Sequence, residues 1–102
     1  MELTPQQVFA RRAGAQIVDV RETGELTEGI IEGAVHIPLG AVPHSHRVLD
    51  PARPVILVCR SGRRSASAAA ELTVAGFDAH TMAGGMLEWA AEGFRTVAPH
   101  TT

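Results

Sequence analysis

The sequence predicts an α/β fold with a mainly parallel sheet. Short apolar segments typical of strands alternate along the chain with segments that carry helical start and stop signals. The clearest strand, residues 54–58, is apolar at every position, which indicates burial on both faces in the middle of a parallel sheet. The 102 residues suit one hydrophobic core, so we expect a single domain over residues 1–102.

A helix is expected near the start of the chain. Thr4 can cap it, Pro5 fits its first turn, and Gln7 completes a capping box with Thr4. Gly14 is expected to end this helix in a left-handed conformation. The buried stripe of the helix is predicted to consist of Val8, Phe9 and Ala13.

Two strands and two less regular segments follow the first helix. Strands are expected at residues 16–20 and 34–37, and a proline closes the second of them. The polar segment 22–28 predicts a turn of helix within a loop. Residues 40–50 are ambiguous, because Pro43 permits a helix only if it lies in the first turn.

The segment after strand 54–58 predicts the longest helix. We expect it to begin near Ser65, a good N-cap residue, to run to Ala75 and to be followed by Gly76 at its C-terminus. A stripe of mostly small residues suits close packing on a sheet, and it consists of Ala66, Ala69, Ala70, Thr73 and Val74.

The last part of the chain is predicted to add one strand and one helix. The strand lies within residues 77–82, a tight turn follows at Gly84-Gly85, and the helix spans residues 86–92 before Gly93. We expect core packing, rather than a cofactor site, to explain the large apolar side chains of this part, which are Met82, Met86 and Trp89.

Composition excludes several classes of protein. Nine basic and eleven acidic side chains give a formal net charge of −2, without the basic surplus of a nucleic-acid-binding surface. No apolar run approaches the roughly 18 residues of a membrane span, and the first residues lack the features of a signal peptide. We therefore expect a cytoplasmic protein that does not associate with membranes. Cys59 is the single cysteine, which excludes an internal disulfide and a Cys-x-x-Cys site.

Three histidines, His36, His44 and His46, raise the question of a metal site. His44 and His46 would lie on one face of a strand, but Pro43 and the loop-like composition disfavour a strand there. We expect these histidines to be solvated or locally bonded, and we predict no metal site.

Cys59 is the strongest candidate for chemistry. It follows strand 54–58 directly, and open α/β sheets bind ligands at the carboxyl ends of their strands. The next residues lead into a helix N-terminus, whose free N–H groups and positive dipole end favour an anion such as a thiolate. The pKa of Cys59 should therefore lie below that of a free thiol. The alternative is a buried, unreactive cysteine, because cysteine is among the most buried residue types.

Arginines surround this cysteine. Every basic residue of the chain is an arginine, and Arg60, Arg63 and Arg64 lie within five residues of the thiol. The guanidinium fork matches oxyanions, so Arg60 and Arg63 are expected to point outward and attract anions. Arg64 has two open roles: it binds substrate, or it points inward to Asp19 or Glu22 and holds the loop. The second role is favoured.

Asp19 is expected to have a structural role. It ends an apolar strand, where an unpaired carboxylate would be costly, so we expect a buried hydrogen-bond or ion-pair anchor rather than a general base. Arg21 either pairs locally or lines the mouth of the site.

The residues around Cys59 resemble the active-site loop of the rhodanese-like sulfurtransferases. Residues 59–65, CRSGRRS, look like the family's C-x-x-G-x-R-S. Further similarities cover nearly the whole chain: DVRE at 19–22, residues 25–39 against E-F-x-x-G-H-I-x-G-A-x-x-I-P-L, GF at 76–77, and the G-G-x-x-x-W pattern at 84–89. Two residues depart from the pattern, Ile30 in place of the usual histidine and Leu26 in place of an aromatic residue.

The resemblance implies a three-layer α/β/α fold with a mainly parallel sheet of four or five strands. It also implies that the Cys59 thiolate takes a sulfur atom from a small anionic donor such as thiosulfate and carries it as a persulfide. The acceptor is then cyanide, a small thiol or a thiol on another protein, and no metal or organic cofactor is needed. The expected loop residues are Arg60, Ser61, Gly62, Arg63, Arg64 and Ser65, with Asp19, Arg21 and Glu22 as structural support.

Two other functions remain as alternatives. A cysteine-dependent phosphatase or arsenate reductase resembles H-C-x5-R, whereas here Val58 precedes the cysteine and Arg64 gives C-x4-R. This loop is one residue shorter than the usual phosphate cradle, and a change of one residue resizes an anion-binding nest. A non-enzymatic rhodanese-like module that binds a partner commonly lacks the cysteine, which is present here. The sequence therefore favours a sulfurtransferase.

Overall fold

Five parallel strands form one sheet in the computed structural model, which describes residues 1–45 and 47–99. The strands are β1 (Glu2–Leu3), β2 (Gln16–Asp19), β3 (Val35–His36), β4 (Val55–Val58) and β5 (Ala79–Met82), in the order β1-β5-β4-β2-β3. The predicted parallel α/β fold is confirmed, and β4 lies at the centre of the sheet. The sequence did not predict β1, because two residues are too few to show a strand period.

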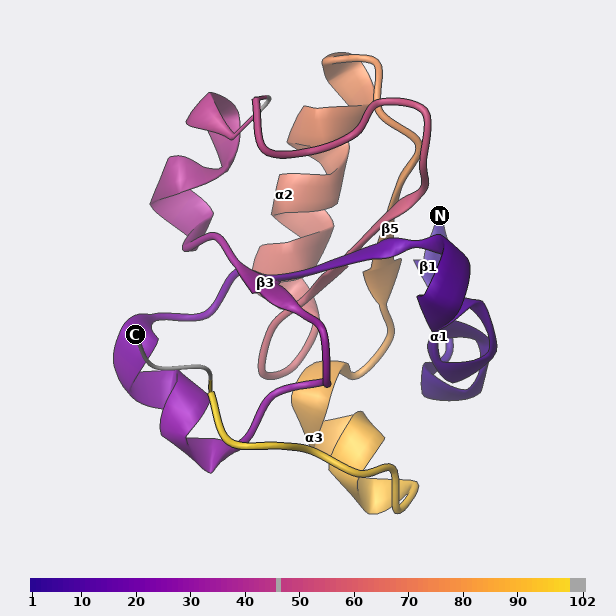
Figure 1. Cartoon of the computed structure of the whole chain (residues 1–102), viewed down its shortest axis with the longest axis vertical. Coiled ribbons are helices and arrows are strands. Elements are labelled where there is room, and N and C mark those ends of the chain that lie inside the picture. The colour runs from indigo at the N-terminus through magenta and orange to yellow at the C-terminus, as the bar shows by residue number, and fades with distance from the viewer. Residues whose placement is uncertain (46, 100–102) are drawn as a thin grey trace.

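Helices cover both faces of the sheet. The α-helices are α1 (Pro5–Arg11), α2 (Arg63–Val74) and α3 (Gly85–Ala91), and the 3-10 helices are η1 (Arg12–Gly14), η2 (Thr23–Glu28) and η3 (Leu39–His44). The C-terminal segment leaves α3 and crosses to the side of η2 (Figure 1). There Ile30 and Val97 form an antiparallel bridge.

The core consists of two clusters that share the sheet. On one face, strand side chains pack against α2 and η3, and on the other they pack against α1 and α3. β4 alternates between them: Val55 and Leu57 belong to the first cluster, and Ile56 and Val58 to the second. This is the three-layer arrangement that the sequence led us to expect.

The first helix begins as predicted but ends differently. Thr4 and Gln7 form the capping box, with each side chain accepting the backbone N–H of the other residue. The helix ends at Arg11 and the chain tightens into η1, so Gly14 does not adopt the expected left-handed conformation. The prediction missed this ending because 3-10 turns at helix ends leave no distinct sequence signal.

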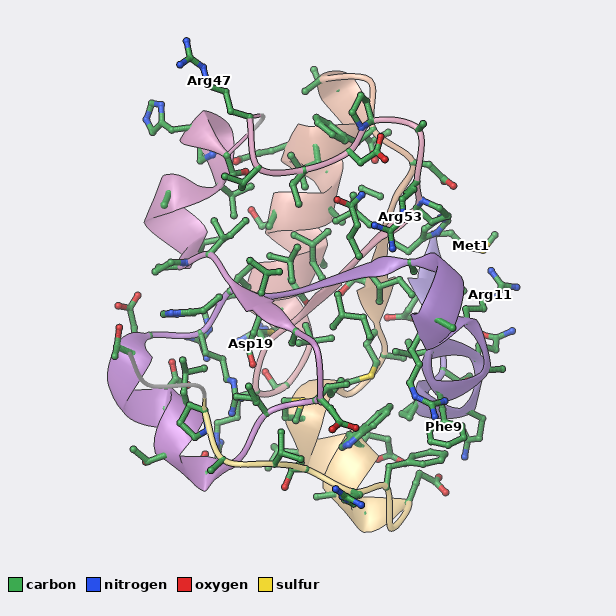
Figure 2. All side chains as sticks on the ribbon, viewed as in Figure 1. Met1, Phe9, Arg11, Asp19, Arg47 and Arg53 are labelled. Carbon is green, nitrogen blue, oxygen red and sulfur yellow. The ribbon has the colours of Figure 1, made fainter. Side chains whose placement is uncertain are left out.

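The predicted buried stripe of α1 was wrong in two of its three residues. Val8 is buried, but Ala13 is exposed and Phe9 is 41% exposed. Phe9 lies at the edge of the core on the side of α1 (Figure 2), where its ring stacks on Phe94 with centroids 4.9 Å apart. Phe9 therefore buries part of its ring against Phe94 and remains partly exposed to solvent.

α2 begins two residues earlier than expected. Gly62, with φ +102°, precedes the helix as its N-cap, and Ser65 lies buried in the first turn. A glycine in this conformation lets the chain enter a helix immediately after a strand and a short loop. The predicted stripe was also wrong except for Ala69: the buried residues are Ser65, Ala68, Ala69 and Leu72. The alanines of this helix do not distinguish its sides, and of its two larger apolar residues Leu72 is buried while Val74 is exposed.

The remaining elements lie close to their expected positions. Gly76 and Gly93 both have positive φ after their helices, as helix-ending glycines do. Residues 40–50, left ambiguous by Pro43, begin inside η3, a short 3-10 helix that has Pro43 in its interior. None of the helices in the described part of the chain is long and apolar enough to span a membrane.

Candidate active site

Cys59 directly follows the central strand β4, at its carboxyl end. Its sulfur accepts the backbone N–H of Gly62 at 3.0 Å and that of Ser65 at 3.4 Å. The Ser65 hydroxyl oxygen lies 3.5 Å from the same sulfur. Two backbone N–H donors and one hydroxyl, from one loop and one helix turn, therefore converge on the sulfur, as the helix N-terminus argument predicted.

The carbonyl groups of the loop point away from the sulfur and are held by α3. Met86 N–H donates to the carbonyl of Cys59 at 2.8 Å, and Leu87 N–H donates to that of Arg60 at 3.0 Å. With these carbonyls fixed on α3, the following N–H groups are left to point at the sulfur. Gly85, with φ +60°, allows this close approach, because a Cβ there would lie 2.4 Å from the Cys59 carbonyl oxygen.

Hydrogen bonding lowers the pKa of the Cys59 thiol below its ordinary value. Burial alone would raise the pKa, and it is the largest single influence. The Ser65 hydroxyl and the backbone N–H groups of Ser65, Gly62 and Ser61 together outweigh it. These hydrogen bonds, from the loop and the helix N-terminus, are the leading causes that lower the pKa.

We expect the alkylation rate of Cys59 to follow a pH midpoint below that of an ordinary cysteine. The loop donors favour the thiolate and therefore add to the free energy of unfolding. This contribution is present above the pKa of the unfolded thiol and is lost as the pH falls through the folded pKa. The measurement is alkylation rate against pH. The same protein unfolded in urea is the control, since its one thiol then lacks the loop donors. A folded midpoint equal to or above the unfolded one would contradict the hydrogen-bond argument.

The three loop arginines separate into two groups. Arg60 and Arg63 are exposed, as expected. Arg64 makes a two-pronged ion pair with Glu25 of η2, with N–O distances of 2.7 and 2.8 Å. The expected partners, Asp19 or Glu22, were wrong. Glu25 was missed because it lies 39 residues from Arg64 in the sequence. The two side chains meet only because η2 packs beside the loop.

Asp19 pairs with Arg21, and both side chains are 1% exposed. The Arg21 guanidinium contacts both carboxylate oxygens and also donates to the backbone carbonyls of Glu25 and Gly29. This buried pair therefore fixes η2 against the end of β2, close to the loop. Glu22 is exposed and caps η2 through a capping box with Glu25.

The Arg64–Glu25 pair is expected to stabilise the fold rather than bind substrate. Arg64→Ala should lower the free energy of unfolding by about 1 kcal/mol, because the pair is bidentate but partly exposed. The Arg64 hydrogen bond holds the pKa of Glu25 at about 2, below the usual 4.5. The stabilisation is therefore present above pH 4.5 and is lost as the pH falls through about 2. Thermal melting across this pH range is the measurement.

Glu25→Gln is the matched variant for this prediction. It keeps an acceptor for the Glu22 N–H but removes the charge that Arg64 binds. A purely structural pair predicts similar melting of Arg64→Ala and Glu25→Gln, with an unchanged KM for an anionic sulfur donor. A KM that rises in Arg64→Ala alone would assign Arg64 to substrate binding.

The two residues that depart from the resemblance lie away from the loop. Leu26 is buried in η2. Ile30 pairs with Val97 and, with Leu26, lines a cavity beside β3. Both positions concern the packing of η2 and the C-terminal segment.

Two of the three histidines that raised the question of a metal site lie within the described residues, His36 and His44. Within residues 1–45 and 47–99, no three His, Cys, Asp or Glu side chains are placed to hold a metal ion. His36 Nε2 bonds to the backbone carbonyl of Arg21, and His44 lies at the end of η3. His46 lies outside the described residues.

Comparisons with known proteins agree with this geometry. The profile of the family described as "Rhodanese-like domain" matches residues 4–92. YtwF of Bacillus subtilis is 40% identical over 76 residues, 74% of each chain. The thiosulfate sulfurtransferase GlpE of Pseudomonas aeruginosa is 35% identical over 102 residues, covering 98% of this chain and 88% of GlpE. The crystal structure of a rhodanese-related protein from Thermoplasma volcanium superposes with a TM-score of 0.91 at 26% identity, covering 96% of this chain and 98% of that one.

Proposed function

The chain belongs to the rhodanese-like domain family, and on this premise we propose that it transfers sulfane sulfur from an anionic donor such as thiosulfate to a nucleophilic acceptor through a persulfide on Cys59. One observation carries the proposal: the Cys59 sulfur lies at the carboxyl end of β4 and receives hydrogen bonds from Gly62 and Ser65. An unreactive buried cysteine has no need of converging donors, whereas a thiolate does.

The reaction needs two displacements at sulfur. The Cys59 thiolate attacks the outer sulfur of thiosulfate, the bond between the two thiosulfate sulfurs breaks, and sulfite leaves with the electron pair. The acceptor, cyanide or a thiolate, then attacks the terminal sulfur of the persulfide. The S–S bond to Cys59 breaks and its electron pair restores the thiolate. Atoms and charge balance without a metal or an organic cofactor.

The loop suits the persulfide for the same reason that it suits the thiolate. A persulfide anion is also stabilised by N–H donors that are already in place before the reaction. Arg60 and Arg63, exposed at the surface of the loop, are proposed to attract the anionic donor. This attraction should appear as a fall in kcat/KM for thiosulfate with rising salt concentration.

Burial of the thiol adds a condition to the mechanism. Cys59 is 0% exposed, so the atoms that cover its sulfur must move before the donor sulfur can reach it. Burial also removes water from the persulfide, which would protect it from unwanted acceptors. We propose that the described ranges form one domain that carries this activity, since the two core clusters share every central strand.

Intact mass measurement after incubation with thiosulfate tests the proposal directly. We expect a gain of one sulfur atom that is lost when cyanide is added. Retention of the original mass with thiosulfate alone would contradict the persulfide mechanism and favour a non-enzymatic partner-binding module. Hydrolysis of a phosphate ester without any mass gain would favour the phosphatase alternative.

A further inference from the structure

The hydroxyl of Ser65, which contacts the Cys59 sulfur, is itself held from behind by a second hydroxyl. Thr81 Oγ1 lies 2.6 Å from Ser65 Oγ. Thr81 belongs to β5, which neighbours β4 in the sheet, and it is 8% exposed. A chain of contacts therefore runs from β5 through the first turn of α2 to the sulfur.

The direction of this chain follows from counting protons. Ser65 Oγ has one proton and three neighbours: the Cys59 sulfur at 3.5 Å, the Gly62 carbonyl at 3.2 Å and Thr81 Oγ1 at 2.6 Å. A thiolate has no proton and can only accept. Ser65 can donate to the thiolate only if it does not donate to Thr81, so a Ser65–thiolate hydrogen bond requires Thr81 to be the donor of the shortest of these bonds.

The surroundings of Thr81 favour the same direction. Within residues 1–45 and 47–99, the Thr81 hydroxyl forms its hydrogen bond with Ser65 Oγ. A buried O–H without an acceptor is costly, so the Thr81 proton is directed to Ser65. One lone pair of the Ser65 hydroxyl is then occupied, and its own proton is left for the sulfur or for the Gly62 carbonyl.

We propose, resting on the proposed function, that Thr81 is a positioning residue for sulfur transfer, because its hydroxyl donates to Ser65 and thereby turns the Ser65 proton toward the Cys59 thiolate. Nothing in the neighbouring strand pattern requires a hydroxyl here, since Ala79 and Met82 on the same strand are apolar and buried.

Other charged groups around the cysteine lie on different elements and do not act through Thr81. Those near the carboxyl end of the sheet contact one another in two pairs: Arg64 with Glu25, and Arg21 with Asp19. His80, the neighbour of Thr81 on β5, contacts Asp78 directly before that strand. Arg60 and Arg63 of the loop and Glu88 of α3 are exposed. A change at Thr81 therefore leaves the charges around the thiol in place.

The test measures alkylation of Cys59 against pH in a set of hydroxyl variants. Thr81→Val, close in shape to threonine, should raise the apparent pKa of Cys59 by roughly half a unit to one unit, since the Ser65 hydroxyl loses the partner that orients it and can turn to the Gly62 carbonyl instead of the sulfur. Thr81→Ser keeps the donor and should restore the parent profile. Thr73→Val is the matched control, because it removes a threonine hydroxyl that bonds only to the Ala69 carbonyl on α2. It should leave the profile unchanged.

A double variant separates positioning from a general structural effect. In a Ser65→Ala background, Thr81→Val should give no further shift in pKa, because the intervening hydroxyl is already absent. An unchanged pKa in folded Thr81→Val, or an equal shift in the Ser65→Ala background, would overturn the inference. Thermal melting identifies a variant that fails to fold, and Thr81→Ala, which adds no apolar bulk, then replaces Thr81→Val in the same comparison.

This experiment does not depend on sulfur transfer. Alkylation reports the thiolate in the absence of any donor, whereas the mass gain with thiosulfate reports the persulfide. A normal mass gain with an unmoved pKa in Thr81→Val would refute the role of Thr81 alone. A shifted pKa in a protein that never gains sulfur would refute the proposed function alone.

Discussion

Replacing Cys59 by serine is expected to abolish sulfur transfer while the fold is retained. The reaction passes through sulfur held covalently on this one thiol, and the chain has no other cysteine to substitute for it. A serine hydroxyl is close in size and can accept the same Gly62 and Ser65 N–H groups, so the loop should keep its shape. Thiocyanate production from thiosulfate and cyanide is the measurement.

The control for this variant is the melting temperature, which should remain near that of the parent. Loss of turnover together with loss of folding would not distinguish chemistry from structure, so Cys59→Ala provides a second variant that adds no buried hydroxyl. Appreciable turnover by either folded variant would contradict the assignment of Cys59 as the sulfur carrier.

The fold was predictable because its strongest signals are local. β4 is apolar at every position, and such a run fits only the middle of a covered sheet. The Thr4 capping box and the turn glycines fix helix ends through contacts a few residues apart. β1 and η1 were missed because each is too short to produce a period.

The site was predictable in its centre and less so at its edges. The position of Cys59 after the central strand follows from chain order, because the carboxyl ends of parallel strands share one edge of the sheet. The partner of Arg64 does not follow from chain order, since Glu25 is brought to it by the buried Asp19–Arg21 pair that holds η2. Long-range contacts of this kind depend on the placement of whole segments.

The exposed side of α2 shows a different limit of sequence reasoning. Alanines occur at several positions around the helix, so the positions of the small residues did not indicate which face is buried. Leu72 settles the orientation because it is the one large apolar side chain that α2 buries. That orientation also turns Ser65 toward β5 and the sulfur.

Gly85→Ala is expected to have the largest structural effect of any single methyl group added near the site. The new Cβ would lie 2.4 Å from the Cys59 carbonyl oxygen and 2.5 Å from that of Arg60. Both neighbours are backbone atoms, so the loop itself must move. The φ of +60° adds strain for any residue with a side chain. Together these costs should lower the free energy of unfolding by roughly 2–5 kcal/mol.

Gly93→Ala separates the two costs. Gly93 also has a positive φ, +81°, but among the described residues no atom beyond its chain neighbours lies within 4 Å of an added Cβ. It should be destabilised by roughly 1–2 kcal/mol from backbone strain alone and keep the parent alkylation profile. Gly85→Ala should melt lower and also raise the pKa of Cys59, because displaced carbonyls no longer hold the loop N–H groups toward the sulfur. If both variants melt alike and alkylate alike, then the contact between α3 and the loop does not shape the thiolate site.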